Sequence, residues 1–201
     1  MQPFTKLTAR AAAIKIQNVD TDQILPARFL RKPRSAGYGN FLFHDLPDDP
    51  AFAEARQVGG ENGVSILVAD RNFGCGSSRE GAVYALVDAG IRCVIAPSFG
   101  DIFASNASKN GLLTVVLEHD DIERLWQSLE ASNASEPTVD LEAQQISVPG
   151  GVTISFEIDG FRKHRLLNGL DDIGLTMAFE ADIVAHEDRM AVGPDWISVR
   201  Q

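Results

Sequence analysis

Residues 72–80, Asn-Phe-Gly-Cys-Gly-Ser-Ser-Arg-Glu, carry the side chains of this chain best suited to chemistry. The hydroxyls of Ser77 and Ser78 stand beside Arg79, whose forked guanidinium suits a carboxylate. Gly74 and Gly76 permit the sharp turns that such a loop needs. The stretch therefore predicts a binding site for a carboxylate substrate.

The same residues also fit a purely structural interpretation. Ser77 and Glu80 have the spacing of a capping box, in which the serine caps a helix and the glutamate reaches back to it. A phosphate-binding loop is disfavoured, because the stretch has neither Gly-x-Gly-x-x-Gly nor a Gly-Lys-Ser/Thr ending. The local pattern leaves capping and substrate binding both open.

The elements around this loop alternate between strand and helix. The apolar run at 64–69 predicts a buried strand before the loop, and 79–89 predicts a helix after it, whose N-terminus would favour an anion. Further strands are expected at 11–17, 91–96 and 112–117, with helices at about 100–110 and 120–130. This alternation predicts parallel βαβ units. A hairpin around residues 149–151 and helices at 161–167 and 171–187 follow.

The whole chain, residues 1–201, is expected to form one domain, because no linker divides it. Residues 26–50 read as a long irregular loop, which is usually functional or disordered. This loop is either a solvated basic loop or a device that steers an anion; its cations are Arg28, Arg31, Lys32 and Arg34. Residues 188–201 read as a peripheral tail.

Composition excludes several classes of protein. A net charge of −10 over 201 residues argues against a nucleic-acid binder. No apolar run approaches the roughly 20 residues that span a bilayer, which argues against a membrane protein. The N-terminus lacks the apolar stretch of a secretory signal, so a cytoplasmic location is expected.

The cysteines and histidines predict no metal site in this chain. Cys93 lies in an apolar run and is expected in the core, whereas Cys75 could be a nucleophile only with a base that no nearby histidine supplies. The four histidines lack the spacing of metal ligands, and two cysteines cannot hold an iron–sulfur cluster alone.

Several ordered motifs resemble the small subunit of 3-isopropylmalate dehydratase (isopropylmalate isomerase). The resemblance covers about residues 4–187 and rests on long motifs, which makes it specific. The matching stretches are Asn-Val-Asp-Thr-Asp-Gln-Ile-Leu-Pro at 18–26, residues 72–80, Ile-Ala-Pro-Ser-Phe-Gly-Asp-Ile-Phe at 95–103, Lys-Asn-Gly-Leu-Leu at 109–113, 140–144 and 167–176.

The resemblance implies the swivelling domain of the aconitase superfamily, an α/β fold with layers in the order β/β/α. It implies a large partner subunit that carries a [4Fe–4S] cluster, while this chain binds no cofactor. The implied reaction dehydrates 2-isopropylmalate and rehydrates the alkene to 3-isopropylmalate, a step of leucine biosynthesis. The implied substrate is thus a small dicarboxylate.

The resemblance also implies roles for individual residues. Ser77 would be the base that removes a proton beside a carboxylate, and Ser78 and Arg79 would bind a substrate carboxylate. Asp22 would orient a histidine of the partner that protonates the departing hydroxyl, with Thr21 assisting by hydrogen bonding. Arg28, Phe29 and Leu30 lie in the loop at 26–50, where the family sets specificity for the substrate side chain.

Two departures leave alternatives open. Gly81 stands where the family usually has histidine, and Thr114 where proline is common. A paralogue that acts on citramalate, dimethylmalate or another 2-substituted malate is one alternative, and a non-catalytic binding module is another. Self-association of the isolated chain is a further possibility. Lys109 and Asn110 are expected to end a helix, with Gly111 following, rather than to bind substrate.

Overall fold

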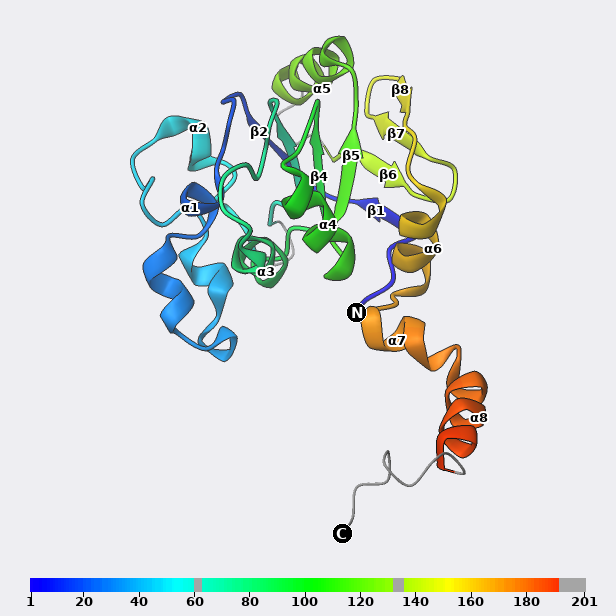
Figure 1. Ribbon diagram of the computed structural model, residues 1–201. Helices are drawn as coiled ribbons and strands as arrows, with labels where there is room; N and C mark the ends of the chain where they lie inside the picture. The colour runs from blue at the N-terminus through cyan, green and yellow to red at the C-terminus, as the bar shows by residue number, and fades with distance from the viewer. Residues whose placement is uncertain (60–62, 132–135, 192–201) are drawn as a thin grey trace.

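The computed structural model describes residues 1–59, 63–131 and 136–191 as two stacked sheets with helices around them (Figure 1). The parallel sheet has the order β2 (Ala11–Ile14), β3 (Ile66–Ala69), β4 (Cys93–Ala96) and β5 (Leu113–Val116). The antiparallel sheet has the order β1 (Lys6–Thr8), β6 (Thr138–Asp140), β7 (Gln145–Val148) and β8 (Val152–Ser155). The predicted βαβ core and the hairpin at 149–151 are confirmed.

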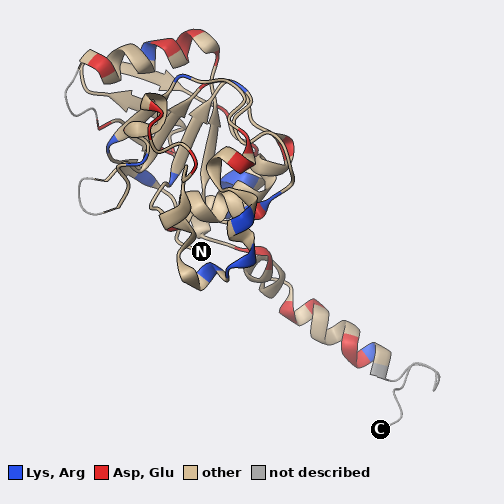
Figure 2. Ribbon diagram, turned by 90° about the vertical axis from the view of Figure 1, so that its left-hand side faces the viewer, with Lys and Arg blue, Asp and Glu red and all other residues tan. Residues whose placement is uncertain are grey.

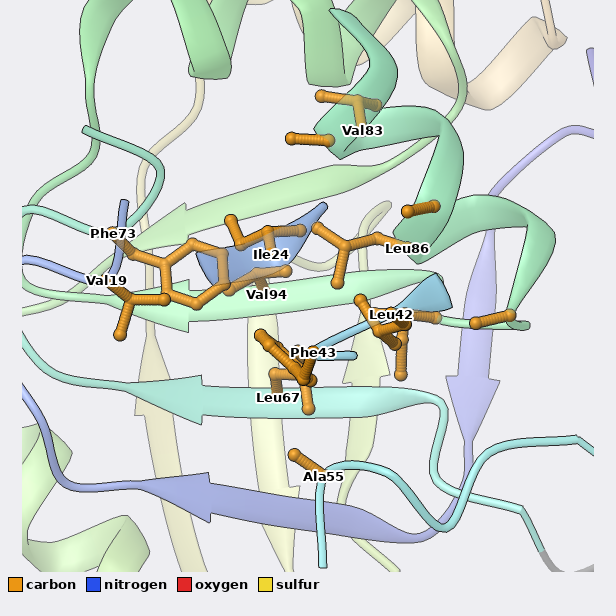
Figure 3. Close-up of a cluster of buried hydrophobic side chains, with 14 of the residues drawn as sticks. Val19, Ile24, Leu42, Phe43, Ala55, Leu67, Phe73, Val83, Leu86 and Val94 are labelled. Carbon is orange, nitrogen blue, oxygen red and sulfur yellow. The ribbon is translucent and has the colours of Figure 1, made fainter. Parts of the chain in front are cut away.

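The central strands β3 and β4 of the parallel sheet are buried on both faces, which explains their continuous apolar runs. In β3, Ile66 and Val68 point into a core shared with the antiparallel sheet, while Leu67 and Ala69 point into the core beneath the helices. Alternate residues of one strand thus serve two cores, and the layers follow the predicted order β/β/α. Figure 3 shows the helix-side core, a cluster that includes Leu67 and Val94 of the sheet and Leu86 of a covering helix.

Helices α3 (Glu80–Asp88) and α4 (Asp101–Lys109) contribute to the helix-side core, together with the short helices α1 (Thr21–Ile24) and α2 (Pro50–Ala53). Helix α5 (His119–Ala131) packs Ile122, Leu125 and Trp126 into the core between the sheets, and the Trp126 indole donates to the Val68 carbonyl at 3.0 Å. The chain then continues through α6 (Gly160–Asn168), α7 (Asp172–Met177) and α8 (Glu180–Ala191).

Residues 26–50 are more regular than the sequence suggests. They contain three 3₁₀ helices, η1 (Ala27–Arg31), η2 (Arg34–Ala36) and η3 (Tyr38–Phe41), and η3 packs against α3. The approach is close enough that a Cβ on Gly39 would lie 2.6 Å from the Ala89 nitrogen. Sequence periodicity misses such turns, because they are too short for a 3.6-residue repeat to show.

The single helix expected at 171–187 is wrong, since two helices form. Helix α7 begins with the Asp171 carboxylate accepting from the Gly174 N–H at 2.7 Å. Its end tightens where Phe179 N–H bonds to the Thr176 carbonyl at 2.9 Å, and α8 then begins at Glu180. No glycine or proline marks this break in the sequence. Residues 188–191 of the expected tail continue α8, and 192–201 lie outside the described residues.

Within the described ranges, no helix is both long and apolar enough to cross a bilayer.

Gly74→Ala is expected to destabilise the fold strongly. Gly74 has φ +72°, and a Cβ there would lie 2.2 Å from Cγ of the Phe103 ring. Positive φ and overpacking together should cost about 2–5 kcal/mol, measured by urea unfolding. Gly90→Ala is the matched control: φ is +96° but nothing lies within 4 Å, so only about 1–2 kcal/mol is lost. Equal losses for the two variants would contradict this account.

Candidate active site

Two motifs that are 50 residues apart in the sequence lie side by side at the loop after β3. The Gly74 N–H donates to the Val19 carbonyl at 2.7 Å, and the Thr21 N–H donates to the Cys75 carbonyl at 2.9 Å. These bonds are those of a short parallel pairing between residues 18–22 and the glycine-rich loop. The fold therefore assembles Thr21, Asp22, Ser77 and Arg79 into one region.

Two further motifs of the resemblance support the same loop. Phe73 N–H donates to the Ser98 carbonyl at 3.1 Å, and Gly100 N–H donates back to Phe73 at 3.0 Å. The Asn110 amide donates to the Glu80 carboxylate at 2.8 Å and so ties the end of α4 to the start of α3. Asn110 is the C-cap of α4, which confirms the expected helix end.

Ser77 and Ser78 are exposed, and neither hydroxyl bonds to another residue of the described chain. The Ser77 main chain is held firmly, because its carbonyl accepts from the Thr21 hydroxyl at 3.2 Å and from Arg79 N–H at 2.7 Å. The Ser77 side chain is therefore available at the surface. It borders a cleft of about 250 Å³ whose other lining residues are Gly74, Cys75, Gly76, Gly100, Asp101, Ile102 and Phe103.

The capping box that the spacing of Ser77 and Glu80 allowed does not form. Helix α3 begins at Glu80, its N-cap is Arg79, and no side chain caps it. The capping box lies instead at α1, where the Asp20 carboxylate accepts from Gln23 N–H at 2.8 Å and the Gln23 side chain accepts from Asp20 N–H at 2.9 Å. The structural alternative for the Ser77 hydroxyl is thereby removed.

Arg79 already holds a carboxylate in this chain. Its guanidinium donates to Asp22, and the same carboxylate oxygen accepts from the Ala27 N–H at 3.1 Å. The Arg79 side chain is 26% exposed, so another molecule can reach it. This ion pair shows that the guanidinium points to a place where a carboxylate fits.

Arg28 has partners other than the loop at 72–80. Its guanidinium donates to Asp45 at 2.6 Å, and this hydrogen bond lowers the pKa of the Asp45 carboxyl to about 2. Arg34 is likewise engaged, by Asp88 at 2.6 Å. The basic loop is thus partly neutralised, and the structure does not place Arg28 against Ser77.

The two cysteines have different surroundings. Cys93 is fully buried in the core, as expected. Cys75 is partly exposed, but burial and the nearby Asp20 carboxylate raise the pKa of its thiol, which works against a thiolate nucleophile. In the part of the chain that the structure describes, no three His, Cys, Asp or Glu side chains are grouped to hold a metal ion.

Gly81, in the first turn of α3, leaves a space that Leu30 fills. A Cβ at position 81 would lie 2.4 Å from Cδ2 of Leu30 and 3.2 Å from Cδ2 of Leu25. Leu30 comes from the 3₁₀ helix η1 and is 37% exposed. The absence of a side chain at position 81, two residues after Arg79, therefore allows Leu30 of the 26–50 loop to pack there.

Comparisons with known proteins show the family of the chain. The model of the aconitase C-terminal domain matches residues 1–120, and LeuD_N matches 123–160. The 3-isopropylmalate dehydratase small subunit of Rhodopseudomonas palustris strain HaA2 is 46% identical over 98% of this chain and 100% of its own length. The same subunit from Acidobacterium capsulatum is 48% identical over 100% of this chain and 96% of its own.

The chain belongs to the family of 3-isopropylmalate dehydratase small subunits. A solved structure of this family, 3-isopropylmalate dehydratase from Methanocaldococcus jannaschii, is similar with a TM-score of 0.66 and 26% identity, covering 91% of this chain and 99% of that one. The resemblance stated from the motifs is confirmed, and so is the fold.

The sequence analysis did not single out a pair of asparagines that joins the motifs at 18–26 and 72–80 by a hydrogen bond. Asn18 and Asn72 have φ +59° and +63°, and the Asn72 amide donates to the Asn18 side chain at 2.7 Å. Asparagine tolerates this left-handed conformation better than most residues. One asparagine at the start of each motif was the available signal.

Thr21→Val should test how the Ser77 main chain is held. Thr21 is buried, so removing its hydroxyl at constant shape should cost about 1 kcal/mol of stability, measured by urea unfolding. Because the lost bond leads to the Ser77 carbonyl, activity with the large subunit should fall by about tenfold. Thr21→Ser keeps the hydroxyl and should retain most activity; equal losses in both variants would contradict a role for this hydrogen bond.

Proposed function

We propose that this chain is the small subunit of a 3-isopropylmalate dehydratase and supplies its base, Ser77. The enzyme is a hydro-lyase of leucine biosynthesis that acts only with a large subunit. The observation that carries the proposal is an exposed Ser77 hydroxyl without a hydrogen-bond partner in the described chain, on a loop that also presents Arg79. Full-length relatives named for this activity support it.

The proposed reaction begins with removal of a proton from the carbon beside a substrate carboxylate. The Ser77 oxygen takes this proton, the hydroxyl on the neighbouring carbon leaves with its bonding electrons, and a double bond forms. The departing hydroxyl becomes water by taking a proton from a histidine of the large subunit. In the second half, water returns that proton to the histidine as its hydroxyl adds to the carbon that lost the first proton, and Ser77 gives its proton to the carbon that lost the hydroxyl. The product is 3-isopropylmalate.

A serine hydroxyl is a weak base, so its deprotonated form must be stabilised by its surroundings. Arg79 supplies a positive charge two residues away, and the first turn of α3 supplies N–H groups that no helical carbonyl accepts. Closure by the large subunit would expel water and strengthen both effects.

Arg79 and Ser78 are proposed to bind a carboxylate of the substrate. Asp22 now occupies the Arg79 guanidinium, and a substrate carboxylate has the same charge and shape. Exchange between the two would free Asp22 to orient a histidine of the large subunit, which would protonate the departing hydroxyl. Thr21 holds the Ser77 main chain in place during this exchange. Arg28 stays a proposed substrate contact that would have to release Asp45.

The iron–sulfur cluster implied by the family is assigned to the large subunit, where it would act as a Lewis acid toward the substrate hydroxyl. The described residues of this chain offer no cluster of ligands for it. The complex is proposed to work in the cytoplasm, where free thiols such as those of Cys75 and Cys93 stay reduced.

Ser77→Ala should lower the turnover of the assembled enzyme by roughly 100- to 10,000-fold without weakening assembly. The measurement is the ultraviolet absorbance of the conjugated alkene after anaerobic mixing with the cognate large subunit. Ser105→Ala, on the exposed side of α4, is the matched control and should change nothing. Little loss of turnover in Ser77→Ala would favour a non-catalytic binding module, and preference for citramalate or dimethylmalate would contradict the assigned substrate.

A further inference from the structure

Helices α7 and α8 form an arm, residues 172–191, that leaves the body of the molecule. Figures 1 and 2 show α8 extending away from both sheets. The arm carries large apolar side chains in contact with solvent: Ile173 is 72% exposed, Phe179 61% and Met177 57%. Such a concentration of exposed apolar groups indicates a binding surface.

The arm is fixed to the body only at its root. The buried Arg165 of α6 donates to the Leu170 carbonyl at 3.0 Å and to the Asp172 carboxylate, and Lys109 of α4 lies 3.9 Å from the same carboxylate. Beyond Asp172, the hydrogen bonds of the arm within the described chain reach back no further than Asp171, the N-cap of α7. These contacts at the root therefore set the direction of the arm, and the rest of the arm is not held to the body by polar contacts of the described chain.

A helix of this kind needs a surface to pack against. Helix α8 has 12 residues, a length at which an isolated helix is marginal in water. Phe179 directly precedes α8, and at 100° per residue Ile183, His186 and Met190 continue the same face, so Phe179, Ile183 and Met190 form a largely apolar stripe that includes one histidine. The stripe has the form of a helix that lies in an apolar groove of a partner.

The charge of the arm favours a different chain over a second copy. Glu180 and Glu187 flank the stripe on one side and Asp182 and Arg189 on the other; with Asp188, α8 carries four carboxylates and one Lys or Arg (Figure 2). Symmetric pairing of two arms would bring like charges together, which opposes self-association. A groove with a basic rim would complement the arm.

We propose that this arm docks the small subunit onto its large subunit, with the stripe in an apolar groove that has a basic rim. The inference rests on the proposed function, which supplies the large subunit. The arm is separate from the loop at 72–80, so it contributes to assembly and not to the chemical step. A weakened arm should therefore raise the concentration of large subunit needed for activity and leave the turnover at saturation unchanged.

The test is binding of the purified large subunit to the full chain, measured by anaerobic isothermal titration calorimetry. The double variant Phe179→Ser with Ile183→Ser should weaken binding at least about 100-fold, since two apolar side chains lose their burial. Phe161→Ser is the matched control, because Phe161 is 59% exposed but lies on α6 in the body; it should bind like the unmodified chain. Urea unfolding midpoints of all variants should agree, since the altered side chains are exposed.

Tight binding by the double variant would overturn the proposal, as would a failure of the unmodified chain to bind. Sedimentation could instead show that the unmodified chain forms a dimer and the double variant a monomer, while both still bind the large subunit. A second copy of this chain would then be the partner of the stripe. Binding is measured without turnover, so an active Ser77→Ala enzyme would overturn the proposed function and leave the docking result standing.

Discussion

The hydrogen bond from Gly74 N–H to the Val19 carbonyl, 2.7 Å long, fixes the relation between the two halves of the active site. It requires a left-handed backbone at Gly74, where the Phe103 ring leaves no room for a Cβ. Phe103 belongs to the core that α3 and α4 share with the parallel sheet. A side chain at position 74 would therefore disturb the packing of the core and the placement of this loop together.

Attraction for an anionic substrate must be local in a chain of net charge −10. Arg28 and Arg34 are held by carboxylates of their own, and the guanidinium of Arg79 is shared with Asp22. The Asp22 carboxylate keeps the partly buried Arg79 guanidinium paired, and under the proposed function a substrate carboxylate would take its place. This arrangement suits a subunit that meets its substrate only after the partner has closed the site.

The molecule divides its tasks between a rigid body and a projecting arm. The body places Ser77 and Arg79 through hydrogen bonds between their loop and three other motifs, whereas the arm carries an apolar stripe with nothing of the described chain to cover it. An incomplete site and an uncovered helix both point to a chain that works in a complex. The root of the arm, Arg165 with Asp172, joins the two parts.

The sequence alone predicted the βαβ core and the hairpin, because runs of apolar residues and glycine positions are local properties, and its long motifs gave the family and with it the layered α/β fold. Only the tertiary structure decided that the Ser77 hydroxyl caps no helix, that Arg79 holds Asp22, and that Leu30 fills the space at Gly81. It also divided the expected helix at 171–187 and directed α8 away from the body. These outcomes depend on contacts between residues far apart in the chain, and no local pattern records which distant side chain will occupy a given space.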